Sequence, residues 1–246
     1  MKLLVCISKA PDTTSKIAFT DGDTKFDENG VQYIVNPYDE WYALVRALEL
    51  TEANGGTVTT ITVGTASDDP TIRKALAIGA TDAVRVDAEA KDPYFVAKQI
   101  AAYAKANSFD IVLTGKETIN YNGAQIGSMI AEMLDQPFVS LAQKLDVSGN
   151  TATLERDVPG GAEVVEVNTP FVLSAAKGMA EQRIPNMRGI MAARTKALNV
   201  IPAVETAELT SIVSYSMPPA KSECKYIDAD NMTELVELLH NEAKVI

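Results

Sequence analysis

The amino-acid sequence predicts an α/β protein with a mostly parallel sheet, helices on both faces of the sheet, added antiparallel hairpins and an extended C-terminal arm. Two observations lead to this fold class. Short apolar runs bounded by turn residues recur along the chain, and helical patterns lie between several of them, in the order β-α-β-α-β-α-β-α-β. The apolar runs that we expect to be strands are residues 3–8, 57–64, 83–86, 110–115, 137–140 and 171–175.

Four helices are predicted between these strands. The first is expected to have Asn36 as its N-cap, Pro37 at its first helical position and its end at residues 54–56. The second begins in the same way at Asp69 and Pro70, and the third covers residues 92–107. The fourth is expected to begin near Gly123 and to place an apolar stripe against the core, formed by Ile126, Met129, Ile130 and Met133.

Two other patterns extend this core. Residues 16–34 and 142–168 alternate apolar and polar side chains and contain glycine turn dipeptides, which predicts antiparallel hairpins. From about residue 197 the pattern loosens, until a short helix near 231–244 presents an apolar face of Met232, Leu235, Val236 and Leu239. We therefore divide the chain into an α/β domain, residues 1–200, and a C-terminal arm with a docking helix, residues 201–246.

Composition and charge narrow the class of protein. The chain has 246 residues, of which 46% are hydrophobic and 22% are charged, as in ordinary globular proteins. Its net charge of −11 argues against a nucleic acid or an anionic membrane as the partner, because both would be repelled.

Cys6 and Cys224 lack metal-site spacing, and no apolar stretch approaches the roughly 20 residues of a membrane helix. The N-terminal apolar run is expected to be a strand rather than a signal peptide, and the protein to be cytoplasmic without membrane insertion.

The stretch LTGKETINYNGAQIGSMIAEML, residues 113–134, has no acidic side chain between Glu117 and Glu132. The first turn of a helix usually attracts acidic residues, because its unpaired N–H groups and the helix dipole are electropositive. The free N–H groups of residues 123–125 would form a phosphate cradle at the carboxyl end of the preceding strand. The alternative is that Asn120 or Asn122 caps the helix and water binds the remaining donors, and the residues alone favour neither interpretation.

The loops after the other predicted strands converge on the same edge of the sheet, where open α/β sheets bind their ligands. Four residues in these loops are small or amide-bearing and suit a nucleotide lying on the backbone: Ala10, Asn36, Val63 and Thr65. Gly115 and Gly123 allow close backbone approach, and Lys116 adds a positive charge. Taken singly, each residue is explained by ordinary loop chemistry. The chain has neither GxGxxG nor GxxxxGK(S/T), which excludes a dinucleotide fingerprint and a P-loop.

Catalytic constellations are scarce. The single histidine, His240, is expected to be a solvated residue of the C-terminal tail, so that a Ser/His/Asp or Cys/His arrangement is improbable. The carboxylates of Asp68 and Asp69 are explained by capping at a helix start. The residues indicate a binding protein rather than a hydrolase, with no catalytic residue and no metal site.

Residues 181–198 contain bulky apolar side chains around Pro185, Gly189, Arg183 and Arg188, namely Ile184, Met187, Ile190 and Met191. Buried, these side chains would belong to the core. Exposed, they would form an adaptable partner-binding surface. The residues alone favour the core.

Four segments together carry a family pattern: VNPYDEWYALVRALEL, TIRKALAIGATDAVRV, TGKETINYNGAQIGSMIAEMLDQP and RIPNMRGIMAARTK. In this order and at these separations they resemble the beta subunit of electron-transfer flavoprotein, and the similarity runs from residue 1 to about residue 200. The segment EQRIPNMRGIMAARTK is most similar to the Fix-type relatives tied to nitrogen fixation and carnitine metabolism.

The resemblance implies a Rossmann-like α/β subunit that pairs with an alpha subunit, which holds the redox-active FAD. In one group of members the beta subunit binds AMP, and in electron-bifurcating members a second FAD takes that place. The family's adenylate contacts correspond to Ala10, Asn36, Val63 and Thr65. Its phosphate loop corresponds to Asn122, Gly123, Ala124, Gln125 and Ile126.

The same resemblance implies a role for the segment around Met187, which is similar to the family's recognition loop. An apolar anchor of that loop inserts into a dehydrogenase partner. Met187 is then the exposed anchor, while Ile190 and Met191 still pack inward. The partner-binding residues implied in this way are Ile184, Pro185, Met187 and Arg188.

Two features depart from the family pattern. AMP-binding members have an acidic run and a threonine in the phosphate loop, whereas this chain has Asn120, Tyr121, Asn122 and, in place of the threonine, Ile126. The missing hydroxyl removes one phosphate donor and brings the loop nearer to bifurcating and Fix-type loops, which leaves both AMP and FAD as candidates for this site. The basic tail of the recognition loop is also thinner, at residues 192–196.

We therefore expect an electron-carrier subunit that binds AMP or FAD and relays electrons from a dehydrogenase, such as an acyl-CoA dehydrogenase, to a quinone oxidoreductase or a reductase. One alternative is a subunit of an NADH-dependent, flavin-based electron-bifurcating complex. A second alternative is a nucleotide-binding protein without a redox partner.

Overall fold

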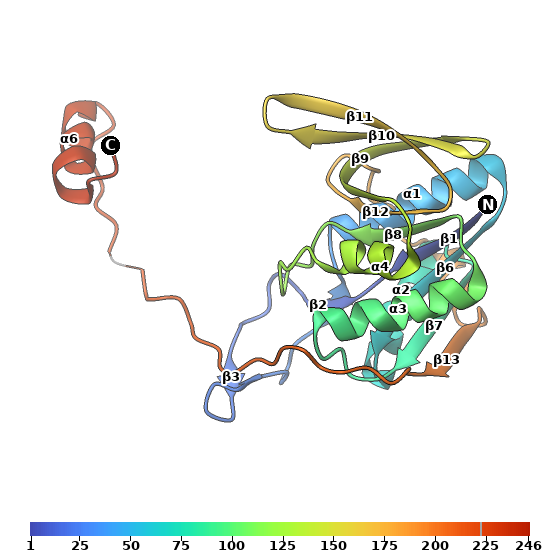
Figure 1. Ribbon diagram of the computed structural model, residues 1–246. Coiled ribbons are helices and arrows are strands. Elements are labelled where there is room, and N and C mark those ends of the chain that lie inside the picture. Colours follow the sequence, from blue (N-terminus) through green and yellow to red (C-terminus); the bar gives the residue numbers. More distant parts are fainter. Residues whose placement is uncertain (222) are drawn as a thin grey trace.

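The computed structural model describes residues 1–221 and 223–246 and is built on one nine-stranded sheet (Figure 1). In spatial order the strands are β11 (Gly161–Asn168), β10 (Thr151–Val158), β9 (Phe138–Ser148), β12 (Phe171–Ala175), β8 (Ile111–Gly115), β1 (Lys2–Cys6), β6 (Thr57–Gly64), β7 (Asp82–Asp87) and β13 (Leu198–Pro202). From β9 to β13 all neighbouring strands are parallel, and β10 and β11 are antiparallel additions. The predicted fold class is confirmed.

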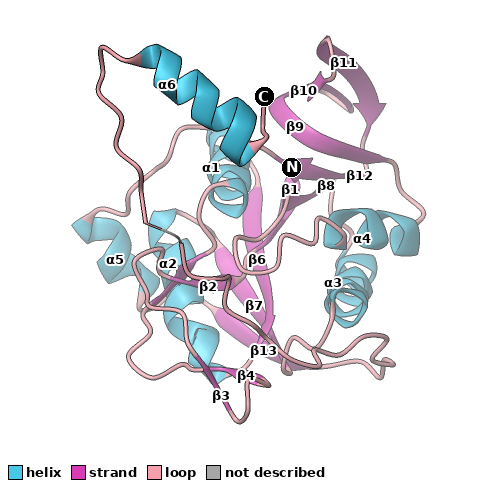
Figure 2. Ribbon diagram, turned by 90° about the vertical axis from the view of Figure 1, so that its left-hand side faces the viewer, coloured by secondary structure: helices cyan, strands magenta, loops and turns pink. Residues whose placement is uncertain are grey.

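Helices cover both faces of the sheet (Figure 2). One face packs against α1 (Asp39–Asn54) and α2 (Asp69–Ile78), with α5 (Met187–Ala193) lying on α2, and the other face packs against α3 (Pro93–Asn107) and α4 (Ile126–Leu134). Successive side chains of a strand point to opposite faces. In β1, Leu3 and Val5 belong to the first core, and Leu4 and Cys6 to the second.

The order of the strands reverses at β1. From β1 the chain passes to β6 and β7 on one side, and α3 then returns it to β8 on the other side of β1. In open α/β sheets, the crevice outside the carboxyl ends of the strands at such a switch point is the place where ligands bind. The switch point of this sheet lies where β1, β6 and β8 end.

The predicted hairpins are present. β2 (Lys9–Pro11) pairs with β5 (Tyr33–Val35), β3 (Phe19–Thr20) pairs with β4 (Lys25–Phe26), and β10 pairs with β9 and β11. The strand predicted at 137–140 is longer, because β9 continues through an irregularity opposite β12 into its antiparallel pairing with β10.

The first helix begins later than predicted, and Asn36 is not its N-cap. α1 begins at Asp39, and Tyr38 precedes it with a φ of 66° and no side-chain cap. Asn36 is fully buried and uses its side chain for bonds outside the helix, so Pro37 also lies outside it. The third helix lies where it was predicted, and the second begins one residue earlier than predicted, at Asp69, with Asp68 in the N-cap position.

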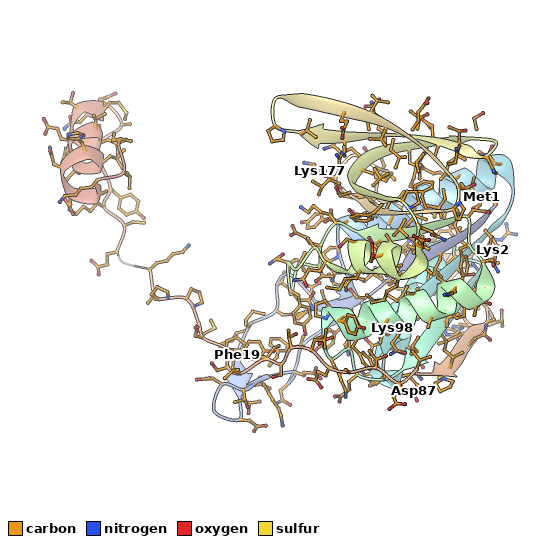
Figure 3. The ribbon with its side chains drawn as sticks, viewed as in Figure 1. Met1, Lys2, Phe19, Asp87, Lys98 and Lys177 are labelled. Atoms are coloured by element: carbon orange, nitrogen blue, oxygen red, sulfur yellow. The ribbon has the colours of Figure 1, made fainter. Side chains whose placement is uncertain are left out.

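The C-terminal arm begins within the sheet, because β13, which ends at Pro202, extends the sheet beside β7. Farther along, Tyr215 stacks on Phe19 of the β3–β4 hairpin with ring centroids 4.7 Å apart, and the arm passes this hairpin in Figure 3. The predicted docking helix is α6 (Met232–Glu237), continued by a π-helical turn over Leu238–Ala243. It stands away from the body at the end of the arm, with Met232 and Val236 each 54% exposed (Figure 1).

Within the described ranges, none of the helices has the length and apolar character needed to cross a membrane.

Candidate functional site

The loop between β8 and α4 forms one side of the crevice. The helix begins at Ile126, so the prediction of a start near Gly123 is wrong. Asn122 and Ala124 have positive φ values of 50° and 51°, which interrupt helical geometry. The predicted apolar stripe of α4 is nevertheless present, because Ile126, Met129 and Met133 pack around the fully buried Ile130.

This loop presents unpaired N–H groups. In the described part of the chain, the backbone N–H groups of residues 123–126 have no hydrogen-bond acceptor, and residues 121–125 are exposed. Ala124 is left-handed and Gln125 right-handed, with φ −107° and ψ −31°. Successive residues of alternating hand turn their N–H groups toward one concavity, which is the geometry of an anion-binding nest. Neither Asn120 nor Asn122 is the residue that caps α4.

The two predicted glycines lie in different surroundings. A Cβ atom at Gly115 would lie 2.9 Å from the backbone N atom of Glu40, so this glycine is required for the packing of β8 against α1. At Gly123 the nearest atom to an added Cβ would be the Nε2 atom of Gln125, at 3.6 Å. Gly123 therefore lies in open space at the concavity. Lys116 is paired with Glu117 at 2.8 Å, which raises the pKa of Lys116.

The end of β6 forms the opposite side of the crevice. Thr65 caps the short 3₁₀ turn Ala66–Asp68, accepting a bond from Ser67 N and donating its own N–H to the Asp68 carboxylate at 3.0 Å. The Nζ atom of Lys9 donates to Ser67 Oγ at 2.9 Å and lies 3.6 Å from the Asp68 carboxylate. Val63, at the end of β6, is half-buried. Lys9 is thus a cation of the crevice wall that was not predicted from the sequence.

Ala10 and Asn36 lie beneath the crevice rather than on its surface, since both are 0% exposed. Ala10 pairs with Ile34 between β2 and β5. The side chain of Asn36 joins the end of β1 to the loop after β8, donating to Ser8 Oγ at 3.0 Å and accepting from Ile119 N at 3.1 Å. The structure thus brings Asn36 together with the 119–126 loop through hydrogen bonds.

Two buried acids at the start of α1 were also missed. Burial raises the pKa of Asp39, and it raises the pKa of the Glu40 carboxyl to about 7, while bonds from Ser8 oppose the second shift. The burial of Glu40 could have been predicted from its distance to Leu44 in the sequence. Glu40 lies four residues before Leu44, and hence on the stripe of α1 that faces the core.

A hollow of about 260 Å³ lies beside the loop. Its lining includes Tyr38, Tyr42, Lys116, Ile119, Asn122 and Lys177. It shares Ile119 and Asn122 with the loop that carries the unpaired N–H groups, so the two features are continuous.

The segment predicted to bind a partner forms α5 and the turn before it. Asn186 caps α5 by accepting a bond from Gly189 N at 2.8 Å. Ile184 is 80% exposed and Met187 73%, which contradicts burial in the core and agrees with an exposed Met187. The expectation that Ile190 and Met191 pack inward is wrong, because they are 40% and 56% exposed.

Small residues explain why these bulky side chains face outward. A Cβ atom at Gly189 would lie 2.3 Å from the carbonyl oxygen of Ala77 in α2, and Ala193 is buried. Gly189 and Ala193 are four residues apart and therefore lie on one face of α5, which packs on α2. The opposite face presents Met187 and Met191, with Arg188 exposed and Pro185 half-buried beside them.

The fold and the loop are of the kind found in nucleotide-binding α/β proteins, with a doubly wound sheet and N–H donors gathered at its switch point. The family model "Electron transfer flavoprotein domain" matches residues 23–206. The chain belongs to the electron transfer flavoprotein family, and specifically to its beta subunits, which are electron-transfer subunits that pair with an alpha subunit.

Named relatives support this assignment. The chain is 36% identical to electron transfer flavoprotein subunit beta of Bacillus subtilis, over the whole of both chains. It is 31% identical to the mitochondrial beta subunit of Oryza sativa subsp. indica, again over the whole of both. The human beta subunit is 30% identical over 90% of this chain and 91% of its own length.

Proposed function

We propose that this chain is the nucleotide-holding beta subunit of a heterodimeric electron transfer flavoprotein. In this proposal residues 1–200 form the nucleotide-binding domain and residues 201–246 the arm. The complex relays electrons from a dehydrogenase, such as an acyl-CoA dehydrogenase, to a quinone oxidoreductase or another acceptor. The observation that carries the proposal is the exposed loop at 122–126, with unpaired N–H groups at the switch point of the sheet.

The residues of this loop fit a phosphate group. The donors are backbone N–H groups, the loop has no acidic side chain between Glu117 and Glu132, and the helix dipole of α4 adds to the local positive potential. The net charge of −11 means that an anion must be held by local geometry of this kind. Gly123 leaves room for close approach, and Thr65 and Lys9 lie on the opposite wall.

The chain's own part in electron transfer is binding and orientation. The FAD of the alpha subunit supplies the redox chemistry when it is bound. This chain would hold the adenine nucleotide, AMP or FAD, between its β6 wall and its 122–126 loop. We assign no acid, base or nucleophile to it.

Met187 is proposed as the anchor of the dehydrogenase contact. It is exposed on a short helix whose other face is fixed to α2 through Gly189 and Ala193. An exposed methionine adapts to irregular apolar pockets, and exposed apolar patches mark interaction surfaces. Ile184, Pro185 and Arg188 complete this surface.

The arm is proposed to cover the alpha subunit. Apolar side chains stay exposed along it, at Leu209, Val213, Met217, Met232 and Val236. An extended segment with an isolated helix gains stability when it settles on another surface, since α6 alone is too short to be stable. A partner chain of this complex provides such a surface.

The alternative of an NADH-dependent bifurcating complex is favoured by one observation. Ile126, at the position where AMP-binding members have a threonine, provides no hydroxyl donor at the start of α4. The loss of this phosphate donor suits FAD rather than AMP in this subunit.

The test is the nucleotide content of the complex. The chain is coexpressed with its alpha subunit, the purified complex is denatured, and FAD and AMP are quantified by chromatography with mass detection. One FAD and one AMP per heterodimer support the electron carrier, and two FAD without AMP support the bifurcating alternative. A complex without a second nucleotide contradicts the proposed site, and a stable monomer that binds a nucleotide indicates a non-redox binding protein.

A further inference from the structure

Glu40 places a buried carboxylate under the crevice. The residue is 6% exposed and lies in the first turn of α1, behind the end of β1. Each of its carboxylate oxygens accepts one bond from Ser8: the backbone N–H donates at 2.7 Å to Oε2, and the hydroxyl donates at 2.8 Å to Oε1. A buried carboxylate is tolerated where hydrogen bonds replace its lost hydration.

These bonds set the direction of a chain of hydrogen bonds. Because Ser8 gives its only hydroxyl proton to Glu40, its oxygen is free to accept from Asn36 Nδ2 at 3.0 Å. The amide of Asn36 is thereby oriented, and its Oδ1 atom accepts from Ile119 N at 3.1 Å. The Nδ2 atom also donates to Asn120 Oδ1 at 3.2 Å.

The loop depends on this chain of bonds. Among the described residues, hydrogen bonds tie residues 119–125 to parts of the protein outside the loop and α4 only through Asn36. The bond from Asn122 N to Thr118 O lies within the loop, and those to Gln125 O come from the first turn of α4. A change in the orientation of the Asn36 amide would therefore release the entrance of the loop.

We propose that Glu40 is a positioning residue of the nucleotide site, which acts through Ser8 and Asn36 to hold the 119–126 loop in its phosphate-binding form. The inference rests on the proposed function, because it assumes that this loop receives a phosphate. It adds that the carboxylate form of Glu40, rather than its bulk, maintains the loop.

The charge state of Glu40 provides a distinguishing signature. Burial raises the pKa of its carboxyl to about 7, and the neighbouring carboxylate of Asp39 acts in the same direction. The other ionisable groups around it are the buried thiol of Cys6 on β1 and, facing Asp39, Lys116 and Glu117. A protonated Glu40 carries its proton on one of its two carboxyl oxygens, which weakens that oxygen as an acceptor of the bond from Ser8. The chain of bonds is therefore complete above pH 7 and weakened as the pH falls through 7.

The first experiment measures AMP and FAD affinity of the heterodimer with Glu40→Gln, Ser8→Ala and the double variant. Glu49→Gln is the matched control, since Glu49 lies on the same helix with a more exposed carboxylate. We expect about tenfold weaker binding in each single variant, no further loss in the double variant and no change in the control. At pH 6 the difference between the native protein and Glu40→Gln should shrink to about twofold, because Glu40 is then mostly protonated. The ionisation of the phosphate affects both proteins equally.

The second experiment measures amide hydrogen exchange without nucleotide. Faster exchange confined to the hydrogen-bonded amides at the entrance of the loop, those of Ile119 and Asn122, is the expected result in Ser8→Ala and Glu40→Gln. Native affinity and exchange in folded variants would overturn the inference, and so would faster exchange throughout the protein, which indicates a merely structural role. If the native complex binds neither nucleotide, the proposed function fails, while the exchange measurement still decides whether Glu40 holds the loop. If Glu40→Gln does not fold, Ser8→Ala alone still tests the inference.

Discussion

Arg73, in α2, donates a hydrogen bond of 2.8 Å to the carbonyl oxygen of Ala193, the last residue of α5. Lys196, which follows α5, makes the converse contact: its Nζ atom donates to the carbonyl oxygens of Leu76, Gly79 and Ala80 at the end of α2. The carbonyl groups at the end of α5 are thus bound by a cation of α2, and those at the end of α2 by a cation that follows α5. The helix that presents Met187 is consequently held by α2.

Lys196→Met should loosen this attachment. Burial lowers the pKa of Lys196, and its ammonium satisfies carbonyl oxygens that would otherwise be left without a partner at the end of α2. We expect a loss of about 1–2 kcal/mol in the free energy of unfolding, measured by urea titration. Lys98→Met is the control, because Lys98 is an exposed lysine of α3 (Figure 3). Equal effects in the two variants would show that Lys196 has no capping role.

Met187→Ala should weaken docking of the dehydrogenase. Removal of a central apolar anchor commonly costs more than 1 kcal/mol of binding, so kcat/KM for electron transfer from the partner should fall by about tenfold. The nucleotide content should remain unchanged, because α5 contributes nothing to the crevice. Val164→Ala, at an exposed apolar position of β11, is the control. Unchanged transfer by the Met187 variant would refute the anchor assignment.

Asp92→Ala should detach the first part of the arm. The Asp92 carboxylate caps α3 by accepting from Phe95 N, and it also accepts from Leu209 N and Thr210 N of the arm. Burial opposes ionisation, but these backbone bonds prevail and lower the pKa of Asp92. Because the pKa of Asp92 is lowered on folding, its carboxylate stabilises the folded protein at every pH above its unfolded pKa, which is near 4. This stabilisation is lost as the pH falls through the pKa of the folded state.

Limited proteolysis tests this attachment. In the native protein, cleavage near residues 205–212 should stay slow and constant between pH 8 and pH 5. In Asp92→Ala it should be faster throughout that range. Glu89→Ala removes an exposed acid nearby and should behave like the native protein. Equal cleavage of both variants would argue against an anchoring role for Asp92.

The core strands could be predicted because each carries a continuous apolar run between turn residues. β6 and β12 begin and end within a residue of their predicted positions, since a strand that is covered on both faces needs no alternation. The start of α1 could not be predicted in this way. The Asn36 amide is used by Ile119, 83 residues away, and no local propensity reveals such a partner.

The candidate site was predictable in outline only. The acid-free stretch pointed to the loop at 122–126, but its alternating backbone hand depends on positive φ values at Asn122 and Ala124, which are not glycines. The outward orientation of Ile190 and Met191 could not be derived from their hydrophobicity. It follows from the contact of Gly189 with Ala77 of α2, which only the tertiary structure supplies.

The most direct test of the central claim is the nucleotide content of a Gly123→Asp heterodimer. The position has open space for a side chain, so an aspartate would add a carboxylate beside the N–H groups without disturbing the packing. Gly123→Ala controls for the added Cβ atom, and Gly161→Asp controls for the added charge at an open glycine of β11. Loss of the beta-subunit nucleotide in Gly123→Asp alone, with the FAD of the alpha subunit retained, is the predicted result. Undiminished nucleotide in Gly123→Asp would contradict a phosphate site at this loop.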